Sequence, residues 1–468
     1  MLEIHGSELR LCDKISRRAM LRIGGLAPLG LGLPTLLANE ALGSEALAAH
    51  FGGSFGRAKR CLVLFMWGGP SQLDLFDMKP NAPSEVRGEF QPASTKVPGM
   101  QICELMPELA KHTDKIALVR SVTHTDNNHS TSAHWMLTGR KHERSAENFS
   151  AKGDDFPNIG SVLTKLAPAR QDLPTFVALP EVINTTIGAT TPGQAGGMLG
   201  KRYDPFQINQ HPDEPDFHVG SLSLPGDVPP LRMNDRKGLL TQFDRLRQRM
   251  ESDADASAMN AYQQQALNLI TSPIAQHAFD IAAESPAERD RYGRGTFGQS
   301  LLLARRLLEA GVRLVTVYWH RERPGGTENS WDTHGDNFRT LKDRLIPQVD
   351  QPLATLLEDL TARGLLDDTL VVWTSEFGRT PKVNGNAGRD HWGPCNSIWM
   401  AGAGIPGGQV YGSSDKIASR PLNDPVTPED LAATTYHLLG LRPETLIYDP
   451  LKRPLPIAEG QVLQRLLG

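Results

Sequence analysis

The sequence has few cysteines, and none of them stands in a metal-binding spacing. Its 468 residues include four cysteines and no Cys-x-x-Cys motif, so a structural zinc site of the ribbon type is not expected. Cys12 lies in an N-terminal leader. The other three, Cys61, Cys103 and Cys395, cannot all pair with one another, and we expect them to be mostly buried thiols.

The sequence also lacks a marked excess of charge of either sign. It contains 49 lysines and arginines against 53 aspartates and glutamates, which gives a formal net charge of −4 at pH 7. This balance gives no reason to expect a nucleic acid or an anionic membrane surface as a partner. Hydrophobic residues make up 39% of the chain, which is enough for a full core, so we expect a globular protein.

An apolar stretch near the N-terminus is too short to span a bilayer comfortably. It covers Ile23–Ala38, whereas a membrane-spanning helix needs about 20 apolar residues. The twin arginine Arg17-Arg18 precedes it, followed by an apolar residue, a leucine and a basic residue. This pattern predicts a twin-arginine export signal; the alternatives are a short N-terminal helix or an uncleaved anchor. We therefore expect a periplasmic or extracellular protein without a transmembrane anchor after processing.

Beyond a leader of residues 1–45, residues 46–468 are predicted to form a single α/β domain. Its apolar runs are short and do not alternate with polar residues, which is typical of strands buried on both faces of a parallel sheet. Residues from about 150 to 235 are rich in proline, glycine and aspartate, so we expect a loop-rich cap insertion there. The predicted strands are residues 60–67, 116–122, 174–180, 312–319, 369–374 and 397–402, and the predicted helices are residues 108–113, 237–249, 256–270, 298–310, 345–363 and 427–440.

Chemically active side chains follow the strand predicted at 369–374. Glu376 and Arg379 come directly after it, and Asp390 and His391 follow a loop rich in glycine and asparagine. In an open α/β sheet, ligands bind outside the carboxyl ends of the strands. This stretch is therefore placed where chemistry usually occurs. The alternative is a capped loop with solvated charges.

A histidine-rich segment follows the strand predicted at 116–122. It contains His124, His129 and His134, and Ser130 stands at the start of a predicted helix. A hydroxyl at a helix start lies near free N–H groups and a positive dipole end, which suits a nucleophile or an oxyanion. Serine and threonine are also ordinary N-caps. Three histidines within eleven residues favour a site.

Two further strand ends carry ligand-type residues. The strand predicted at 312–319 is followed by His320 and then by Asp332 and His334, which are spaced to converge on a cation; the alternative is a solvated turn. The first strand is followed by Asp74. Several carboxylates with several histidines suit zinc, manganese or a mixed two-metal centre. The chemistry this favours is metal-assisted hydrolysis of a phosphate or sulfate ester.

These motifs resemble those of a known superfamily. Residues 371–378, Val-Val-Trp-Thr-Ser-Glu-Phe-Gly, resemble the Thr-Ser-Asp-His-Gly strand end of sulfatases and of the wider alkaline-phosphatase superfamily. Residues 129–140 resemble their nucleophile helix, which ends in Leu-Thr-Gly-Arg. More closely, the whole chain resembles the exported, sulfatase-like domain-of-unknown-function family numbered fifteen-oh-one. The matching segments are the twin-arginine leader and residues 68–74, 331–336, 376–381 and 388–392.

The resemblance implies an alkaline-phosphatase-like fold, which is a three-layer α/β sandwich with a largely parallel central sheet and long cap loops. It brings no established activity, and the sequence departs from active members at several positions. Gly68-Gly69 stand where the resemblance places a metal aspartate, which leaves Asp74 or Asp77 as displaced substitutes. Phe377 stands where the second ligand of an Asp-His pair is expected.

The nucleophile position departs as well. Counting back from Thr138 in the resembling helix places the nucleophile of the superfamily on His129, one residue before Ser130. No cysteine-to-formylglycine motif is present, so a formylglycine sulfatase is not expected.

These observations lead to two hypotheses of function. The first is a metal-dependent hydrolase of sulfate or phosphate esters, which would act on a small-molecule or polysaccharide ester with zinc, manganese or calcium. The second is a non-catalytic binding protein of the same fold that holds a sulfated polysaccharide or a protein partner. The candidate metal ligands are Asp74, Asp332, His334, Glu376, Asp390 and His391; the candidate catalytic residues are His129, Ser130 and Arg379; the candidate substrate-binding residues are His124, His134 and His320.

Overall fold

The computed structural model describes residues 53–170, 172–185, 187–219, 269, 272–320 and 330–468. The chain separates into two compact units, residues 1–55 and residues 56–468, and the second unit carries the fold that follows. The leader and the helix predicted at 237–249 lie outside the described residues, as does nearly all of the helix predicted at 256–270. The export signal therefore stays a prediction.

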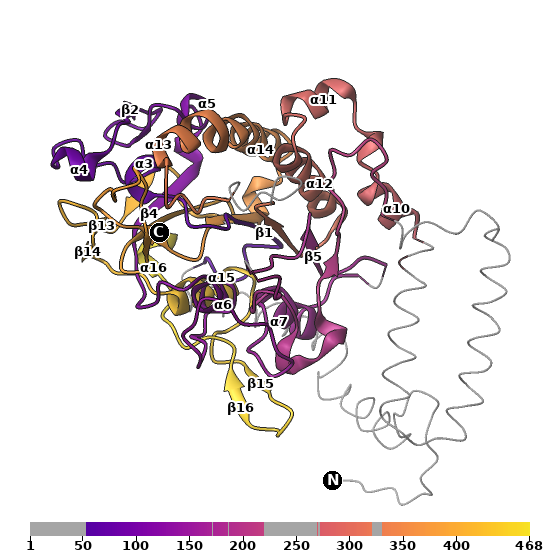
Figure 1. The fold of residues 1–468 in the computed structure, drawn as a ribbon. Coiled ribbons are helices and arrows are strands. Elements are labelled where there is room, and N and C mark those ends of the chain that lie inside the picture. The colour runs from indigo at the N-terminus through magenta and orange to yellow at the C-terminus, as the bar shows by residue number, and fades with distance from the viewer. Residues whose placement is uncertain (1–52, 171, 186, 220–268, 270–271, 321–329) are drawn as a thin grey trace, which may run out of the picture. The chain divides into compact units, whose positions relative to one another are not determined.

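An eight-stranded sheet forms the centre of the second unit, in the order β12-β4-β11-β8-β1-β7-β5-β6 (Figure 1). Neighbouring strands run parallel except at β11, which is antiparallel to both β8 and β4. In the register of the sheet, Phe65 at the end of β1 lies opposite Tyr318 of β7 and Thr374 of β8. These three carboxyl ends therefore meet at one edge. The strands are β1 (Arg60–Phe65), β4 (Ile116–Val122), β5 (Phe176–Leu179), β6 (Phe206–Gln207), β7 (Leu314–Tyr318), β8 (Thr369–Thr374), β11 (Asn396–Ala401) and β12 (Gln409–Tyr411).

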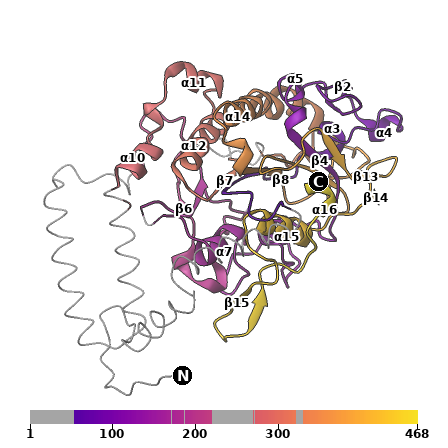
Figure 2. The ribbon, with the colours of Figure 1, turned by 180° about the vertical axis from the view of Figure 1, so that it is seen from behind.

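Helices cover both faces of this sheet, which confirms the predicted α/β class with its largely parallel sheet. Figure 1 shows α5, α12 and α14 on one side and α6, α7 and α15 on the other, and the view from behind in Figure 2 agrees. The helices are α3 (Gln72–Leu75), α4 (Ser84–Arg87), α5 (Pro107–Ala110), α6 (His129–Thr138), α7 (Ile159–Leu166), α10 (Pro273–Phe279), α11 (Pro286–Arg291), α12 (Thr296–Ala310), α13 (Asn337–Thr340), α14 (Asp350–Ala362), α15 (Pro428–Leu438) and α16 (Gln464–Leu467).

Four short two-stranded ribbons decorate the loops. One of them, formed by β9 and β10, lies beside the candidate site. Another, formed by β13 and β14, follows β12 in the chain. Their strands are β2 (Pro92–Ser94), β3 (Gln101–Cys103), β9 (Gly378–Arg379), β10 (His391–Trp392), β13 (Ser413–Ser414), β14 (Pro421–Asn423), β15 (Leu446–Tyr448) and β16 (Pro454–Pro456).

Two predicted segments differ from the structure. The helix predicted at 345–363 begins as an α-helix only at Asp350, after a π-helical turn and a 3₁₀ turn. Pro347 lies in that 3₁₀ turn, and its missing N–H cannot continue an α-helical ladder. Within the segment predicted as a loop-rich cap, β5 is the strand predicted at 174–180, whereas α7 and β6 were not predicted; β5 and β6 belong to the central sheet. The three cysteines outside the leader are free and buried, as predicted.

Helix α6 is held against α15 so closely that only glycine fits at its end. All ten residues of α6 are buried, and Trp135 Nε1 donates a hydrogen bond of 2.7 Å to Glu429 Oε1. Gly139 ends the helix at φ +70°, and its N–H donates to the carbonyl oxygen of Trp135 at 2.8 Å. A Cβ at Gly139 would lie 2.2 Å from Ala432 Cβ on α15. This contact holds the C-terminal end of α6 against α15.

We expect Gly139→Ala to lower the free energy of unfolding more than Gly364→Ala. Both glycines have positive φ angles, +70° and +66°, so alanine brings backbone strain of about 1 kcal/mol at either position. Among the described residues a Cβ at Gly364 meets nothing within 4 Å, whereas at Gly139 overpacking adds about 1–3 kcal/mol. Urea unfolding of both variants measures the difference. Equal losses would show that the α6–α15 contact does not constrain the helix.

Candidate functional site

Side chains from four loops meet at the carboxyl ends of the central strands. His129 opens α6 after β4, Asp332 follows β7, Glu376 follows β8, and His391 lies in β10. Because the carboxyl ends of parallel strands lie at the same edge of a sheet, residues far apart in the sequence come together there. The sequence analysis selected these four residues for the same reason. In the structure His129 contacts Glu376 and Asp332, and His391 contacts Asp332.

His129 lies between two carboxylates. Its Nδ1 is 2.7 Å from Glu376 Oε1, and its Nε2 is 3.2 Å from Asp332 Oδ2. Glu376 is fully buried, and its Oε1 also accepts a hydrogen bond of 2.7 Å from the N–H of Gly68. A buried carboxylate bound to one ring nitrogen fixes the plane of the imidazole and directs the other nitrogen.

The glycines after β1 allow the chain to cross at this point. A Cβ at Gly68 would lie 2.4 Å from the backbone nitrogen of Asp332, and one at Gly69 would lie 2.6 Å from the ring of Phe377. Both glycines have positive φ angles. The N–H of Trp331 donates to the carbonyl oxygen of Trp67 at 3.0 Å, which ties the crossing loop to the strand end. A carboxylate at position 68 would displace the loop that carries Asp332, and one at position 69 would displace Phe377.

Asp332 gathers four positively polarised groups. Its Oδ1 lies 3.0 Å from His391 Nε2, 3.2 Å from His334 Nε2 and 2.6 Å from Arg379 Nη2. Its Oδ2 faces His129. Burial raises the pKa of Asp332, but its contacts with the three histidines and the charge of Arg379 outweigh burial and hold that pKa far below its usual range.

The three histidines of this cluster share one orientation. Besides His129, His391 donates from Nδ1 to the carbonyl oxygen of Asn127 at 2.8 Å, and His334 Nδ1 lies 2.8 Å from Asp390 Oδ1. Each Nδ1 thus has an oxygen acceptor, and each Nε2 is directed at Asp332. The Nε2 atoms of His334 and His391 lie 2.9 Å apart. Two such nitrogens and a carboxylate oxygen this close repel one another unless a proton or a cation lies among them.

The charge state of the cluster follows from burial and from these contacts. Burial opposes the charged form of His129, but hydrogen bonds with Asp332 and Glu376 raise its pKa to about 9. The pKa of His391 is lowered, chiefly by burial, and that of His334 is raised by its hydrogen bond with Asp332. In the metal-free protein His129 therefore carries a proton at neutral pH and acts as the cation between two carboxylates.

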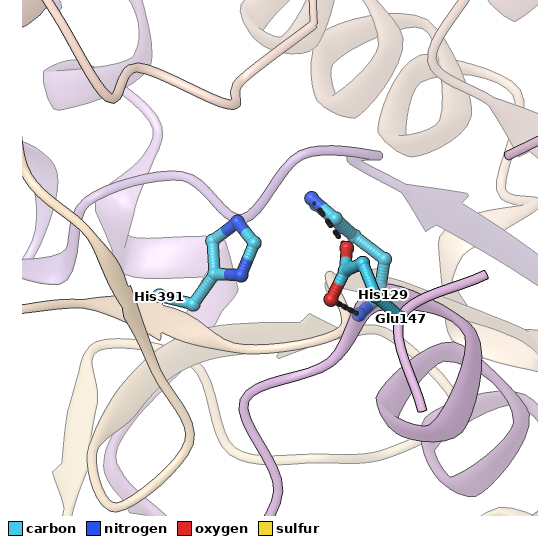
Figure 3. A group of neighbouring side chains, drawn as sticks. All are labelled: His129, Glu147 and His391. Atoms are coloured by element: carbon cyan, nitrogen blue, oxygen red, sulfur yellow. Dashed lines mark hydrogen bonds and ion pairs between the residues drawn. The ribbon is translucent and has the colours of Figure 1, made fainter. Parts of the chain in front are cut away.

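Glu147 is a site residue that the sequence interpretation missed. Its Oε2 accepts a hydrogen bond of 3.2 Å from the backbone N–H of His129, and its Oε1 lies 3.9 Å from His129 Nε2. Figure 3 shows the carboxylate lying along the imidazole of His129, with His391 facing the pair. Glu147 lies beyond the end of α6 on a loop that follows no strand, so strand-end reasoning does not find it.

The hydroxyl groups at the start of α6 hold the loop that carries Glu147. Ser130 Oγ donates to the carbonyl oxygen of Glu147 at 2.7 Å, and Thr131 Oγ1 donates to that of Arg144 at 3.0 Å. The N–H of Ala146 donates back to Thr131 Oγ1 at 3.1 Å. Ser130, the candidate nucleophile, is thus fully buried, and its hydroxyl is hydrogen-bonded to the backbone of the loop that carries Glu147.

Arg379, a candidate catalytic residue, is fully buried beneath the cluster. Besides Asp332, its guanidinium donates to the carbonyl oxygens of Gly69 at 2.8 Å, Trp331 at 3.2 Å and Arg389 at 2.9 Å, and also to that of Gly68. The side chain connects the loops after β1, β7 and β8. The structure therefore places Arg379 as a positioning residue for Asp332.

Asp74 is the candidate ligand that the structure places outside the cluster. Arg389 donates from Nε to Asp74 Oδ2 at 2.8 Å and from Nη2 to Oδ1 at 3.0 Å, and Asn337 Nδ2 donates to Oδ2 at 3.0 Å. Both partners of this ion pair are buried. The carboxylate of Asp74 thus forms a bidentate ion pair with Arg389. Although Asp74 follows β1 closely in the sequence, it does not contact His129.

The remaining candidates hold the surroundings of the site. His124 Nε2 lies 2.7 Å from the carbonyl oxygen of Glu376, and His134 Nδ1 lies 3.0 Å from that of Arg140. Burial lowers the pKa of both histidines, to about 3 for His134, so both are neutral. His320 packs against Trp319 and faces His211, with ring centroids 5.1 and 5.8 Å apart. None of these contacts is with Asp332.

The donor set of the cluster fits a divalent metal ion. Asp332, His334 and His391 offer one ligand atom each within 4.8 Å of one another, and so do His129, Glu147 and His391. Imidazole nitrogens with a carboxylate oxygen are the donors that zinc and manganese prefer, whereas calcium prefers oxygen alone. Among the described residues, Glu376 Oε2 is buried without a hydrogen-bond partner.

One protein-family model matches residues 58–467, and its description is "Protein of unknown function (DUF1501)". Among solved structures, a sulfatase from Pseudoalteromonas sp. matches at 14% identity, with 85% of this chain and 70% of that chain covered and a TM-score of 0.39. A phosphonate monoester hydrolase from Silicibacter pomeroyi matches at 13%, with 87% and 76% covered and a TM-score of 0.39. An alkaline phosphatase superfamily protein from Vibrio parahaemolyticus matches at 12%, with 83% and 67% covered and a TM-score of 0.38.

No curated protein matches the chain. Within the part of the chain that the structure describes, no helix has both the length and the apolar character needed to cross a membrane.

We expect the imidazole of His129 to titrate near pH 9 in the metal-free protein, against an ordinary value of 6.5. Because the folded-state pKa is raised, this group stabilises the fold fully below pH 6.5, and the stabilisation is lost as the pH rises through about 9. NMR of the imidazole nitrogens measures the titration, with His129→Gln identifying the signal. A midpoint at or below the ordinary value would contradict the proposed charge state.

We expect Arg389→Met to lower the free energy of unfolding by about 3–5 kcal/mol, because it leaves the buried carboxylate of Asp74 without its cation. Lys96→Met is the matched control, since it breaks an ion pair with Asp114 that lies at the surface. Such a pair contributes less than about 1 kcal/mol. Chemical unfolding compares the two variants, and similar losses would mean that the Asp74–Arg389 pair is not a structural requirement.

Proposed function

This chain belongs to the DUF1501 family, and we propose that it is a metal-dependent hydrolase of sulfate or phosphate esters. One observation carries the proposal. The Nε2 atoms of three histidines, each fixed at Nδ1 by an oxygen acceptor, are directed at the two oxygens of Asp332. Oriented imidazoles around a carboxylate are the arrangement of a metal centre with its outer hydrogen bonds already in place.

In this proposal Asp332, His334 and His391 hold the ion. Three protein ligands leave an open position, which is the pattern of catalytic rather than structural zinc sites. When bound, the ion supplies positive charge that polarises the oxygens of the ester group. Glu376 and Asp390, which the sequence suggested as ligands, instead orient His129 and His334 through Nδ1.

His129 is the residue we assign to proton transfer. Its Nε2 faces the ligand cluster, and the buried carboxylate of Glu376 holds its Nδ1 at 2.7 Å. Such a group suits a general acid, which gives its proton to the leaving-group oxygen as the ester bond breaks. Glu147 is partly exposed on the same side, where a carboxylate can take a proton from an attacking water. The buried hydroxyl of Ser130 has no role in this scheme.

A second candidate function rests on a different observation. The ring of Phe377 stacks on His391, with centroids 4.3 Å apart and an angle of 29° between the planes. Gly68-Gly69 add no carboxylate on the opposite side. A pocket in which an aromatic ring and two glycines replace ligands suits a non-catalytic binding protein that retains the fold. The metal content of the purified protein separates the two functions.

We expect the purified protein to contain about one zinc or manganese ion per chain, and His391→Ala to lose both the ion and any hydrolysis of p-nitrophenyl sulfate or phosphate by more than about a hundredfold. Elemental analysis by mass spectrometry gives the ion content, and chromogenic assays give the rate. His218→Ala is the control, because His218 is exposed and its Nδ1 lies 2.8 Å from the carbonyl oxygen of Asp216. A folded, metal-free wild-type protein would favour the binding function, and a retained rate in His391→Ala would refute the assignment.

A further inference from the structure

A second concave surface lies behind the β9–β10 ribbon of the candidate site. It is an open pocket of about 610 Å³. Its walls combine an indole ring, two prolines, two hydroxyl groups and two basic side chains, while the sequence interpretation assigned no function to any of them. The lining residues are Thr380, Pro381, Lys382, Trp392, Pro394, Ile417, Ser419 and Arg420.

The ribbon connects this pocket to the metal cluster. In its register His391 lies opposite Arg379, and Trp392 lies opposite Gly378. Successive side chains of a strand point to opposite faces, so His391 faces Asp332 while Trp392 faces the pocket. A ligand that occupies both places has to pass over the edge of the ribbon. A chain of several units can do this, whereas a single small ester cannot.

The indole of Trp392 is held in a fixed position in the pocket wall. Its Nε1 donates a hydrogen bond of 2.7 Å to the carbonyl oxygen of Ser419. Asp415 holds the same loop, because its Oδ1 accepts from the N–H groups of Ser419 at 2.7 Å and Ile417 at 3.2 Å. A fixed, half-buried aromatic face contacts the C–H groups of a sugar ring without losing side-chain freedom on binding.

Two basic side chains give the pocket its charge. Lys382 is exposed, and within the described ranges it makes no ion pair. Arg420 is 78% exposed, and its Nε lies 3.7 Å from Asp415 Oδ2, an oxygen that also accepts a hydrogen bond from Ser419 Oγ. Both cations can therefore reach a ligand. Guanidinium and ammonium groups bind sulfate and phosphate oxygens through charge-assisted hydrogen bonds.

We infer that this pocket binds a sugar unit of a polysaccharide that carries sulfate or phosphate groups. The indole contacts the sugar ring, and Lys382 and Arg420 bind its anionic substituents. The inference deepens the proposed function, because it assigns a polymeric substrate to the same site, but binding at the pocket needs neither the metal nor hydrolysis.

Affinity electrophoresis tests the inference with four polymers in the gel: dextran sulfate, a phosphorylated mannan, uncharged dextran and polyvinyl sulfonate, which is a polyanion without sugar. We expect the wild-type protein to be retarded by one or both of the anionic glycans, which also separates sulfate from phosphate recognition. Trp392→Ala and the double variant Lys382→Gln/Arg420→Gln should each weaken retardation about tenfold. Uncharged dextran should not retard any of the proteins.

The control variant is Arg442→Gln/Lys452→Gln, which removes the same charge from exposed positions elsewhere. If Trp392→Ala fails to fold, Trp392→Leu and the double variant still provide the test. No retardation of the wild type by either glycan, equal retardation by polyvinyl sulfonate, or unchanged retardation of the pocket variants would each overturn the inference. Metal content measured on the same samples reports on the proposed hydrolase separately.

Discussion

The carboxylate of Asp332 is the group on which the candidate site depends. This partly buried carboxylate contacts the guanidinium of Arg379 and also has three imidazole nitrogens within 3.2 Å. Each imidazole is in turn fixed by an oxygen from another loop. The site is therefore a converging set of hydrogen bonds in which loops after β1, β4, β7 and β8 hold one another, and loss of the central charge would release all of them.

Glycine makes this convergence possible. The backbone of Gly68 passes the loop that carries Asp332, and that of Gly69 lies against Phe377, at distances that no side chain permits. The two glycines give an N–H to Glu376 and carbonyl oxygens to Arg379. The same residues that remove a carboxylate from the first strand end thus bring the remaining carboxylates close together. His129, protonated between Asp332 and Glu376, supplies the positive charge on that side of the site.

The sequence predicted the sheet and much of the site because both depend on local patterns. Strands buried on both faces show continuous apolar runs, and the polar residues after them must meet at one edge, which identified His129, Asp332, Glu376 and His391. The direction of a side chain is not a local property. Asp74 therefore turned out to pair with Arg389, and Glu376 and Asp390 lie behind imidazoles. Glu147 reaches the site through hydroxyl contacts of α6 with the loop that follows this helix, which no spacing in the sequence indicates.

The proposed metal centre requires imidazole nitrogens, and not carboxylates alone, around the ion. X-ray absorption spectroscopy at the edge of the co-purified metal tests this requirement most directly, because imidazole rings give outer-shell scattering that carboxylates do not. We expect scattering from two or more imidazoles in the wild-type protein and a reduced imidazole signal in His334→Ala. A spectrum with oxygen ligands only would contradict it.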